Sequence, residues 1–162
     1  MDNYFIAIPI AEDKKLEVEE IASKLREKLP NLRWVRPELF HITLKFIGKK
    51  GREYALKEFE RFKPDINSLK CKGPGMFYYD KAKENPRVLF LKYSDNKRNE
   101  YHLTLARAGR NENSERIITT IQETENNILF DNLSFRAEKA VLMHSKIEDK
   151  LVYETVAERI LK

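Results

Sequence analysis

Apolar residues recur along this chain at two spacings, one typical of amphipathic helices and the other typical of strands. In residues 13–29 they fall at positions 18, 21, 22, 25 and 29, with glutamate and lysine between them, which is the spacing of an amphipathic helix. Elsewhere, β-branched and aromatic residues form short runs bounded by turn-forming residues, as strands do. The predicted helices span residues 13–29, 52–62 and 114–126, and the predicted strands span residues 4–10, 32–35, 39–48, 68–79, 86–93 and 101–107, before a closing hairpin over 135–147 and 151–161.

The predicted elements belong to one compact α+β unit. No segment rich in Gly, Pro or Ser divides the 162 residues, although Gly73-Pro74-Gly75 predicts a break that splits residues 68–79 into two strands. Two similar strands are each followed by a short stretch, a helix and further strands, and such an internal echo indicates a repeated architecture. We therefore expect a single domain over residues 1–162, with two β-sheet lobes that are flanked by helices and related by an approximate twofold axis.

The two similar strands carry the same motif, H-x-T-L. It occurs in FHITLKF, residues 40–46, and in YHLTLAR, residues 101–107, and it takes up two of the three histidines in the chain. Residues two apart lie on the same face of a strand, so His41 shares a face with Thr43, and His102 with Thr104. One copy is an ordinary strand sequence, but two copies favour the two halves of one site.

The same alternation assigns faces to the residues that follow each motif. Lys45 falls on the face of His41, which makes it a candidate phosphate-binding cation, while Phe46 falls on the opposite, apolar face. Arg107 falls on the face opposite to His102, so it reaches the site only if the strand twists or ends there.

Paired imidazoles and hydroxyls suit the chemistry of phosphodiesters. Because the pKa of histidine lies near neutral pH, one ring can remove a proton from the attacking oxygen while the other protonates the leaving oxygen. The threonine hydroxyls can donate to the non-bridging oxygens. A metal site at His41 and His102 is less attractive, because neither motif holds a Cys, Asp or Glu to complete a ligand set. We interpret His144 and Cys71 as structural strand residues.

The composition indicates the class of protein and the compartment in which we expect it. Hydrophobic residues make up 41% of the chain and charged residues 35%, as in a globular protein with a heavily charged surface. A single cysteine cannot form an internal disulfide, and no apolar run approaches the ~20 residues of a membrane span. We therefore expect a cytoplasmic monomer without membrane contact. The net charge of +5 permits a polyanionic partner without requiring one.

The paired motifs resemble those of the two-histidine (2H) phosphoesterase superfamily, which is defined by two H-x-T/S motifs. More narrowly, the chain resembles the LigT-like RNA 2′,3′-cyclic phosphodiesterases, historically called 2′-5′ RNA ligases. The likeness extends beyond the motifs: YFIAIPI resembles the opening strand, LRWVRPEL the lead-in to the first motif, GPGMF and PRVLFL the central strands, and AVLMHSKI with LVYETVAERI the closing hairpin.

This resemblance implies a bilobal fold with the active site in the cleft between the lobes, and no metal or organic cofactor. It implies that the protein opens 2′,3′-cyclic phosphates at RNA ends or on small cyclic nucleotides, leaving a 2′-phosphate, with weak 2′-5′ RNA ligase activity. It also implies that His41 and His102 are the acid–base pair, that Thr43 and Thr104 hold the phosphate, and that Arg107 assists them. Our working hypothesis is that His41 protonates the leaving 3′ oxygen and His102 activates water.

Two features depart from the family pattern. Only about ten residues separate Leu91 from His102, too few for the helix that family members carry there. The second lobe is therefore expected to be trimmed of one helix and closed by a hairpin or a tight extended link. In addition, Tyr101 replaces the proline that often precedes the second histidine.

Two other functions stay open. One is a non-catalytic module that binds RNA or nucleotides in the same cleft. The other is a 2H phosphodiesterase that acts on cyclic oligonucleotides or ADP-ribose cyclic phosphate. For any of these ligands, Phe40, Phe77 and Tyr101 are candidates for stacking on a base, although each is better explained as a core residue.

Overall fold

The computed structural model describes residues 2–127 and 130–161, and its helices and strands follow the predicted order. The helices are α1 (Glu12–Lys28), α2 (Arg52–Arg61) and α3 (Ser114–Asn127), with short 3₁₀ turns η1 (Pro37–Leu39) and η2 (Asp131–Leu133). The strands are β1 (Asn3–Pro9), β2 (Arg33–Trp34), β3 (His41–Gly48), β4 (Ser68–Tyr78), β5 (Pro86–Ser94), β6 (Glu100–Arg107), β7 (Phe135–Arg136), β8 (Lys139–Ile147) and β9 (Leu151–Ile160).

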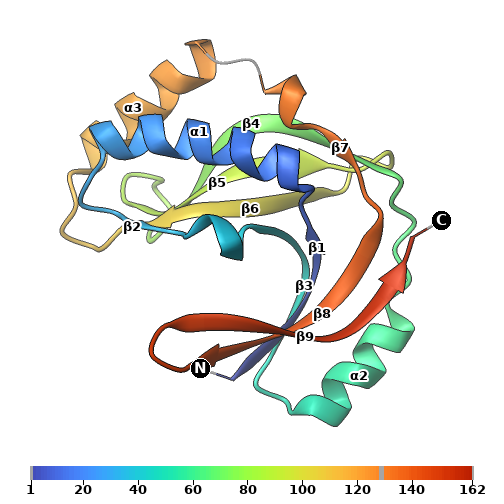
Figure 1. Cartoon of the computed structure of the whole chain (residues 1–162). Coiled ribbons are helices and arrows are strands. Elements are labelled where there is room, and N and C mark those ends of the chain that lie inside the picture. The colour runs from blue at the N-terminus through green and yellow to red at the C-terminus, as the bar shows by residue number, and fades with distance from the viewer. Residues whose placement is uncertain (1, 128–129, 162) are drawn as a thin grey trace.

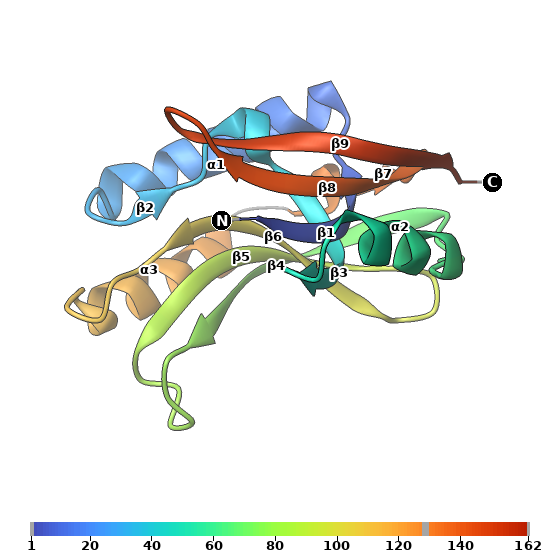
Figure 2. The ribbon, with the colours of Figure 1, turned by 90° about the horizontal axis from the view of Figure 1, so that it is seen from below.

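The strands form one antiparallel sheet that is pinched in its middle. Its order is β7-β4-β5-β6-β3-β1-β8-β9, with β2 paired to the free side of β6. The two central strands, β3 and β6, meet through a single residue pair, Thr43 with His102. The sheet therefore divides there into two lobes. Seen from below, β8 and β9 lie on one side of the central strands β1, β3 and β6, and β4 and β5 lie on the other (Figure 2). We call them the second-motif lobe (β4 to β7 with β2) and the first-motif lobe (β1, β3, β8 and β9).

The second-motif lobe carries the larger core. Alternate residues of β5 and β6, including Leu89, Leu91 and Leu103, pack with buried residues of α1 and α3. These two helices cover the same side of the sheet (Figure 1). The first turn of α1 is acidic and its last turn is basic, so its charges complement the helix dipole as well as facing solvent.

The first-motif lobe has its own small core on its outer side. Tyr4 and Ile6 of β1 pack there with Ala55 and Phe59 of α2, and Figure 1 shows α2 beneath this sheet, away from the other lobe. Because helices cover the outer sides of both lobes, their remaining faces turn toward each other. The predicted α+β bilobal fold is confirmed.

Two local predictions meet different outcomes. The connection between β5 and β6 is a hairpin whose turn is held by Asp95, because the backbone N–H groups of Lys97 and Asn99 each donate to Asp95 Oδ1 at 2.9 Å. The predicted hairpin link without a helix is therefore confirmed. The predicted break at Gly73-Pro74-Gly75 is wrong: β4 is one continuous strand. Gly73 instead lies at a register shift, with a φ of +106°, a backbone conformation that suits a residue without a Cβ.

Within the described residues, no helix is long and apolar enough to cross a membrane.

Candidate active site

The pinch between β3 and β6 places the two motifs on one face of the sheet. Thr43 pairs with His102, and antiparallel partners share a face. His41 and Thr104 lie two residues along from this pair, so all four motif residues fall on the face between the lobes. Continuing the register sets His41 opposite Thr104, so that an approximate twofold axis exchanges the two motifs.

His41 is held in one orientation by its neighbours. Its Nδ1 lies 2.8 Å from the carbonyl oxygen of Leu39, at the end of η1. A carbonyl can only accept, so Nδ1 carries a proton and, in the neutral ring, Nε2 does not. Nε2 then accepts from the hydroxyl of Thr43 at 3.0 Å. The ring is also stacked on Phe5, at 4.8 Å between centroids, and meets the edge of Tyr153 at 5.3 Å.

His102 lies in a different, aromatic setting. Its ring meets Phe77 edge-on at 5.1 Å between centroids and Phe90 at 5.5 Å. Gly75, opposite Phe90 on β4, makes this packing possible, since a Cβ at position 75 would come within 2.6 Å of the Phe90 ring. Phe77 is 40% exposed, so part of this side chain stays open to solvent beside His102.

Both histidines have a pKa below the usual value of 6.5. For His41 the largest cause is burial, the carbonyl of Leu39 opposes it, and the charge of His102 lowers the pKa further. For His102 burial is again the largest cause, followed by the positive charge of Arg107. The effect of His102 on His41 shows that the two rings share one electrostatic environment. In the free protein, both rings are therefore mainly neutral at pH 7.

Arg107 reaches this face because β6 contains a bulge. Thr104 pairs with Phe90, but the next step along β5 pairs Leu89 with Ala106, so Leu105 is an extra residue. The insertion reverses the alternation, and Arg107 joins Thr104 on the cleft face. The carbonyl of Leu105 still finds a partner, because it accepts from the N–H of Val35 at 2.9 Å. Strand parity alone placed Arg107 on the wrong face.

A matching bulge in β3 has the opposite effect on Lys45. Thr43 pairs with Ala7 and Lys45 with Ile6, so Leu44 is the extra residue. Lys45 therefore turns to the outer face, where its Nζ lies 2.7 Å from Glu58 Oε2 on α2. The prediction that Lys45 shares the face of His41 is wrong.

The same bulge corrects the prediction for Phe46. It pairs with Phe5 on the cleft side and is 65% exposed, whereas ideal alternation assigned it to the apolar face. Among the three stacking candidates, Phe40 is buried in the core. The hydroxyl of Tyr101 donates to Asp95 Oδ2 at 3.2 Å in the β5–β6 turn. Only Phe77 of the three has an open ring beside a motif histidine.

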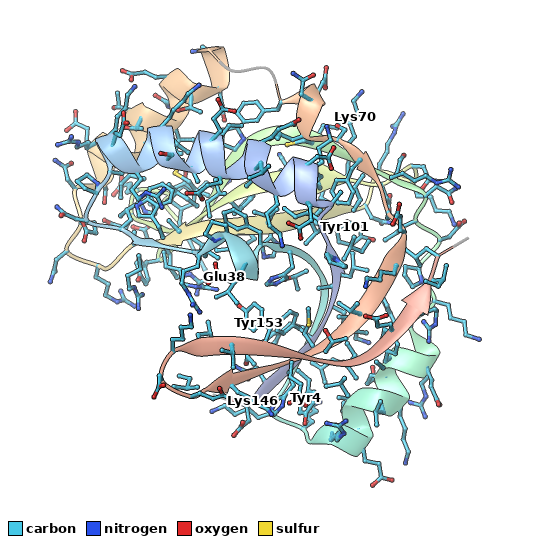
Figure 3. The ribbon with its side chains drawn as sticks, in the orientation of Figure 1. Tyr4, Glu38, Lys70, Tyr101, Lys146 and Tyr153 are labelled. Atoms are coloured by element: carbon cyan, nitrogen blue, oxygen red, sulfur yellow. The ribbon has the colours of Figure 1, made fainter. Side chains whose placement is uncertain are left out.

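Sequence reasoning missed two residues beside His41, Phe5 and Tyr153. Tyr153 of β9 contacts the His41 ring, and Figure 3 shows it on the side of the hairpin that faces the other lobe, while Tyr4 and Lys146 lie on the opposite side. Burial raises the pKa of Tyr153, and the charges of Arg107 and Arg36 oppose this. Tyr153 thus lies within reach of cations from the other lobe. No motif marks Phe5 or Tyr153, because each comes from a segment distant from both histidines.

We expect Arg107→Gln to raise the pKa of His102 toward 6.5, because it removes a charge that lowers it. The measurement is an NMR titration of the histidine Cε1 protons, with Arg116→Gln on the exposed face of α3 as the matched control. An unchanged His102 titration in Arg107→Gln would contradict the placement of Arg107 at the site.

The same pKa values predict how stability depends on pH. A histidine whose pKa is lowered by folding binds fewer protons in the folded than in the unfolded chain, so the free energy of unfolding falls as pH drops below 6.5. Denaturant unfolding between about pH 7 and about pH 5 should show this loss, and Arg107→Gln should reduce it.

Among the described residues, no group of three or more His, Cys, Asp or Glu side chains is arranged to hold a metal ion.

Comparison with known proteins identifies structures of similar fold and a matching protein family. The structure is similar to E. coli LigT in its apo form, with a TM-score of 0.71 and 16% sequence identity over 99% of this chain and 97% of that one. It is similar to TT0787 of Thermus thermophilus, with a TM-score of 0.69 and 17% identity over 98% and 97% of the chains. A search of curated protein sequences gave no significant match. The family described as LigT like Phosphoesterase matches residues 8–90, which include the first motif and just over half of the chain. The chain therefore belongs to the LigT-like phosphoesterase family, within the 2H phosphoesterase superfamily.

Proposed function

We propose that the protein is a metal-independent cyclic phosphodiesterase that opens 2′,3′-cyclic phosphates at RNA ends or on nucleotides. The observation that carries this proposal is the pair of histidines on one face of the sheet, each with a threonine two residues on. Binding alone does not require two imidazoles, one of which is fixed with its unprotonated Nε2 on a threonine hydroxyl. A protein of the same fold, E. coli LigT, has been crystallised with 3′-AMP, which supports a nucleotide ligand.

In the proposed reaction, a water oxygen attacks the phosphorus and the P–O3′ bond breaks. His102 takes the proton of the water, and protonated His41 gives its Nε2 proton to O3′, so the product is a 2′-phosphate. Both pKa values are lowered in the free protein, so the anionic substrate also affects the protonation of the two rings. Its negative charge raises the pKa of both rings, which favours the singly protonated pair that the reaction needs.

The remaining residues stabilise charge on the phosphate. The hydroxyls of Thr43 and Thr104 donate to the non-bridging oxygens as negative charge grows in the transition state. Arg107, placed on this face by the β6 bulge, neutralises the same group. Lys45 has no part in this mechanism, because it is paired with Glu58 on the outer face. If the 5′-hydroxyl of a second RNA end takes the place of water, it attacks the same phosphorus as the P–O3′ bond breaks, and the same groups would catalyse a weak 2′-5′ joining of RNA ends.

We expect the purified protein, treated with a chelator, to hydrolyse adenosine 2′,3′-cyclic phosphate and to leave adenosine 2′-phosphate. Chromatography separates the 2′- and 3′-phosphates and so identifies which bond is broken. A complex that holds the cyclic phosphate unopened would instead support the non-catalytic binding module. Hydrolysis of cyclic oligonucleotides or ADP-ribose cyclic phosphate, with none of the nucleoside cyclic phosphate, would support the other substrate classes.

A further inference from the structure

A pocket adjoins His41 on the side of Tyr153. It has a volume of about 360 Å³, which lies within the usual range of small-molecule sites. Its walls come from the first turn of α1, from η1 and from the start of β9. Neither His102 nor Thr104 lines it. The pocket therefore extends the cleft beyond His41, away from the second motif. The lining residues used below are Lys15, Arg36, Glu38, His41, Lys150 and Tyr153.

The pocket carries more positive than negative charge. Lys15, Arg36 and Lys150 line it, against the single carboxylate of Glu38. Glu38 lies 3.0 Å from Arg36, and Lys15 Nζ lies 3.3 Å from Glu12, whose side chain is 89% exposed. Exposed pairs of this kind are weak, so Lys15 remains able to bind an anion, as does Lys150.

Arg36 holds the pocket together across the two lobes. One end of its guanidinium contacts Glu38, and Nη2 donates to the carbonyl of Leu151 at the start of β9. Figure 3 shows Glu38 and Tyr153 facing each other from the two lobes. The pocket is thus built before any ligand arrives, which lowers the entropic cost of binding.

The chemistry of the cyclic phosphate decides which part of a substrate this pocket meets. The leaving oxygen, O3′, belongs to the ribose of the terminal nucleotide. The ribose therefore lies on the side of the histidine that protonates this oxygen, while water attacks from the opposite side. With His41 as the acid, the terminal nucleoside and its 5′ oxygen project toward the pocket.

We propose that this pocket binds the phosphodiester on the 5′ side of the terminal nucleotide of an RNA end. The inference rests on the proposed function for its assignment of His41 as the acid. Lys15 and Lys150 supply charge-assisted hydrogen bonds to a phosphodiester, which a cyclic mononucleotide lacks, and Arg36 adds positive charge to the same wall. Tyr153 forms the wall between this phosphodiester and the reacting phosphate.

The test compares two ligands that differ by one nucleotide. The probes are adenylyl-(3′→5′)-adenosine 2′-phosphate and adenosine 2′-phosphate, and the readout is the dissociation constant at several salt concentrations. The wild-type protein should bind the dinucleotide about tenfold more tightly. For the dinucleotide, the slope of log affinity against log salt should also be steeper, by about 0.7 for each additional phosphate that the protein neutralises.

The variant Lys15→Ala/Lys150→Ala should lose most of this preference. Lys57→Ala is the matched control, since Lys57 pairs with Glu53 on the surface of α2 at 3.5 Å, much as Lys15 pairs with Glu12, and it should keep the wild-type ratio. Equal affinity of the wild-type protein for the two probes, or an equal preference in the double variant, would overturn the proposal.

Turnover separates this inference from the proposed function. If the protein prefers the dinucleotide but opens no cyclic phosphate, the result supports the pocket assignment and contradicts the proposed reaction. Conversely, hydrolysis of adenosine 2′,3′-cyclic phosphate without any preference for the dinucleotide would support the proposed reaction and overturn the pocket assignment.

Discussion

Replacement of either His41 or His102 by alanine is expected to lower kcat for a 2′,3′-cyclic nucleotide by a factor of about 10²–10⁴, the usual contribution of one general acid or base. The two rings occupy one face of the pinched sheet, and in the proposed mechanism each moves a separate proton. If the proposed roles are right, the double variant should lose little more than the slower single variant, because the two act as a unit. Steady-state kinetics on the chelated protein measure these effects.

The third histidine provides the matched control. His144 stacks on Tyr4 at 4.4 Å between centroids, and Tyr4 belongs to the outer core beside α2. His144→Gln should therefore keep kcat near the wild-type value. Thermal unfolding of all four variants shows whether each is folded. Retention of most of the activity by a folded His41→Ala or His102→Ala would rule out the acid–base mechanism.

Replacement of Thr43 or Thr104 by valine should lower kcat by about 10²–10³, which is typical of the loss of one preorganised donor to a developing negative charge. Valine keeps the branched shape but has no hydroxyl. The hydroxyl of Thr43 also donates to His41 Nε2 in the free protein, so in the proposed mechanism it turns to the phosphate when substrate binds. Thr43→Val is therefore expected to change the pH dependence of kcat/KM as well.

Serine variants test whether the hydroxyl itself is responsible. Thr43→Ser and Thr104→Ser keep the donor and lose only a methyl group, so each should recover most of the activity that valine removes. Kinetics in which serine and valine variants behave alike would show that shape, and not hydrogen bonding to the phosphate, explains these positions.

Much of the fold was predictable because each element carries its own pattern. The helical period in residues 13–29 predicted α1 to within one residue at each end. The alternation around each motif placed His41 with Thr43 and His102 with Thr104, as the single pair between β3 and β6 requires. The ten-residue spacing before the second motif correctly predicted a hairpin without a helix, because a chain of that length has room for little more than a turn.

Strand parity failed where one extra residue entered a strand. Bulges at Leu44 and Leu105 turned Lys45 out of the cleft and Arg107 into it. A signal for the second bulge is present in the sequence. The buried apolar positions of β6 and the residue after it change from odd numbers, Leu103 and Leu105, to even numbers, Ala106 and Ala108. Alternation that changes phase within one strand indicates a bulge.

By itself, the sequence determined the helices, the strands and the two motif faces, because these depend on residues within a few positions of each other. Only the tertiary structure decided what surrounds His41. The contact from Arg36 to the carbonyl of Leu151 joins residues 115 positions apart, and no local pattern specifies it. The lowered pKa values of both histidines likewise arise from burial, which depends on how the lobes pack. Local periodicity determines which side a residue faces, but the neighbours it meets there are set by the folding of distant segments onto one another.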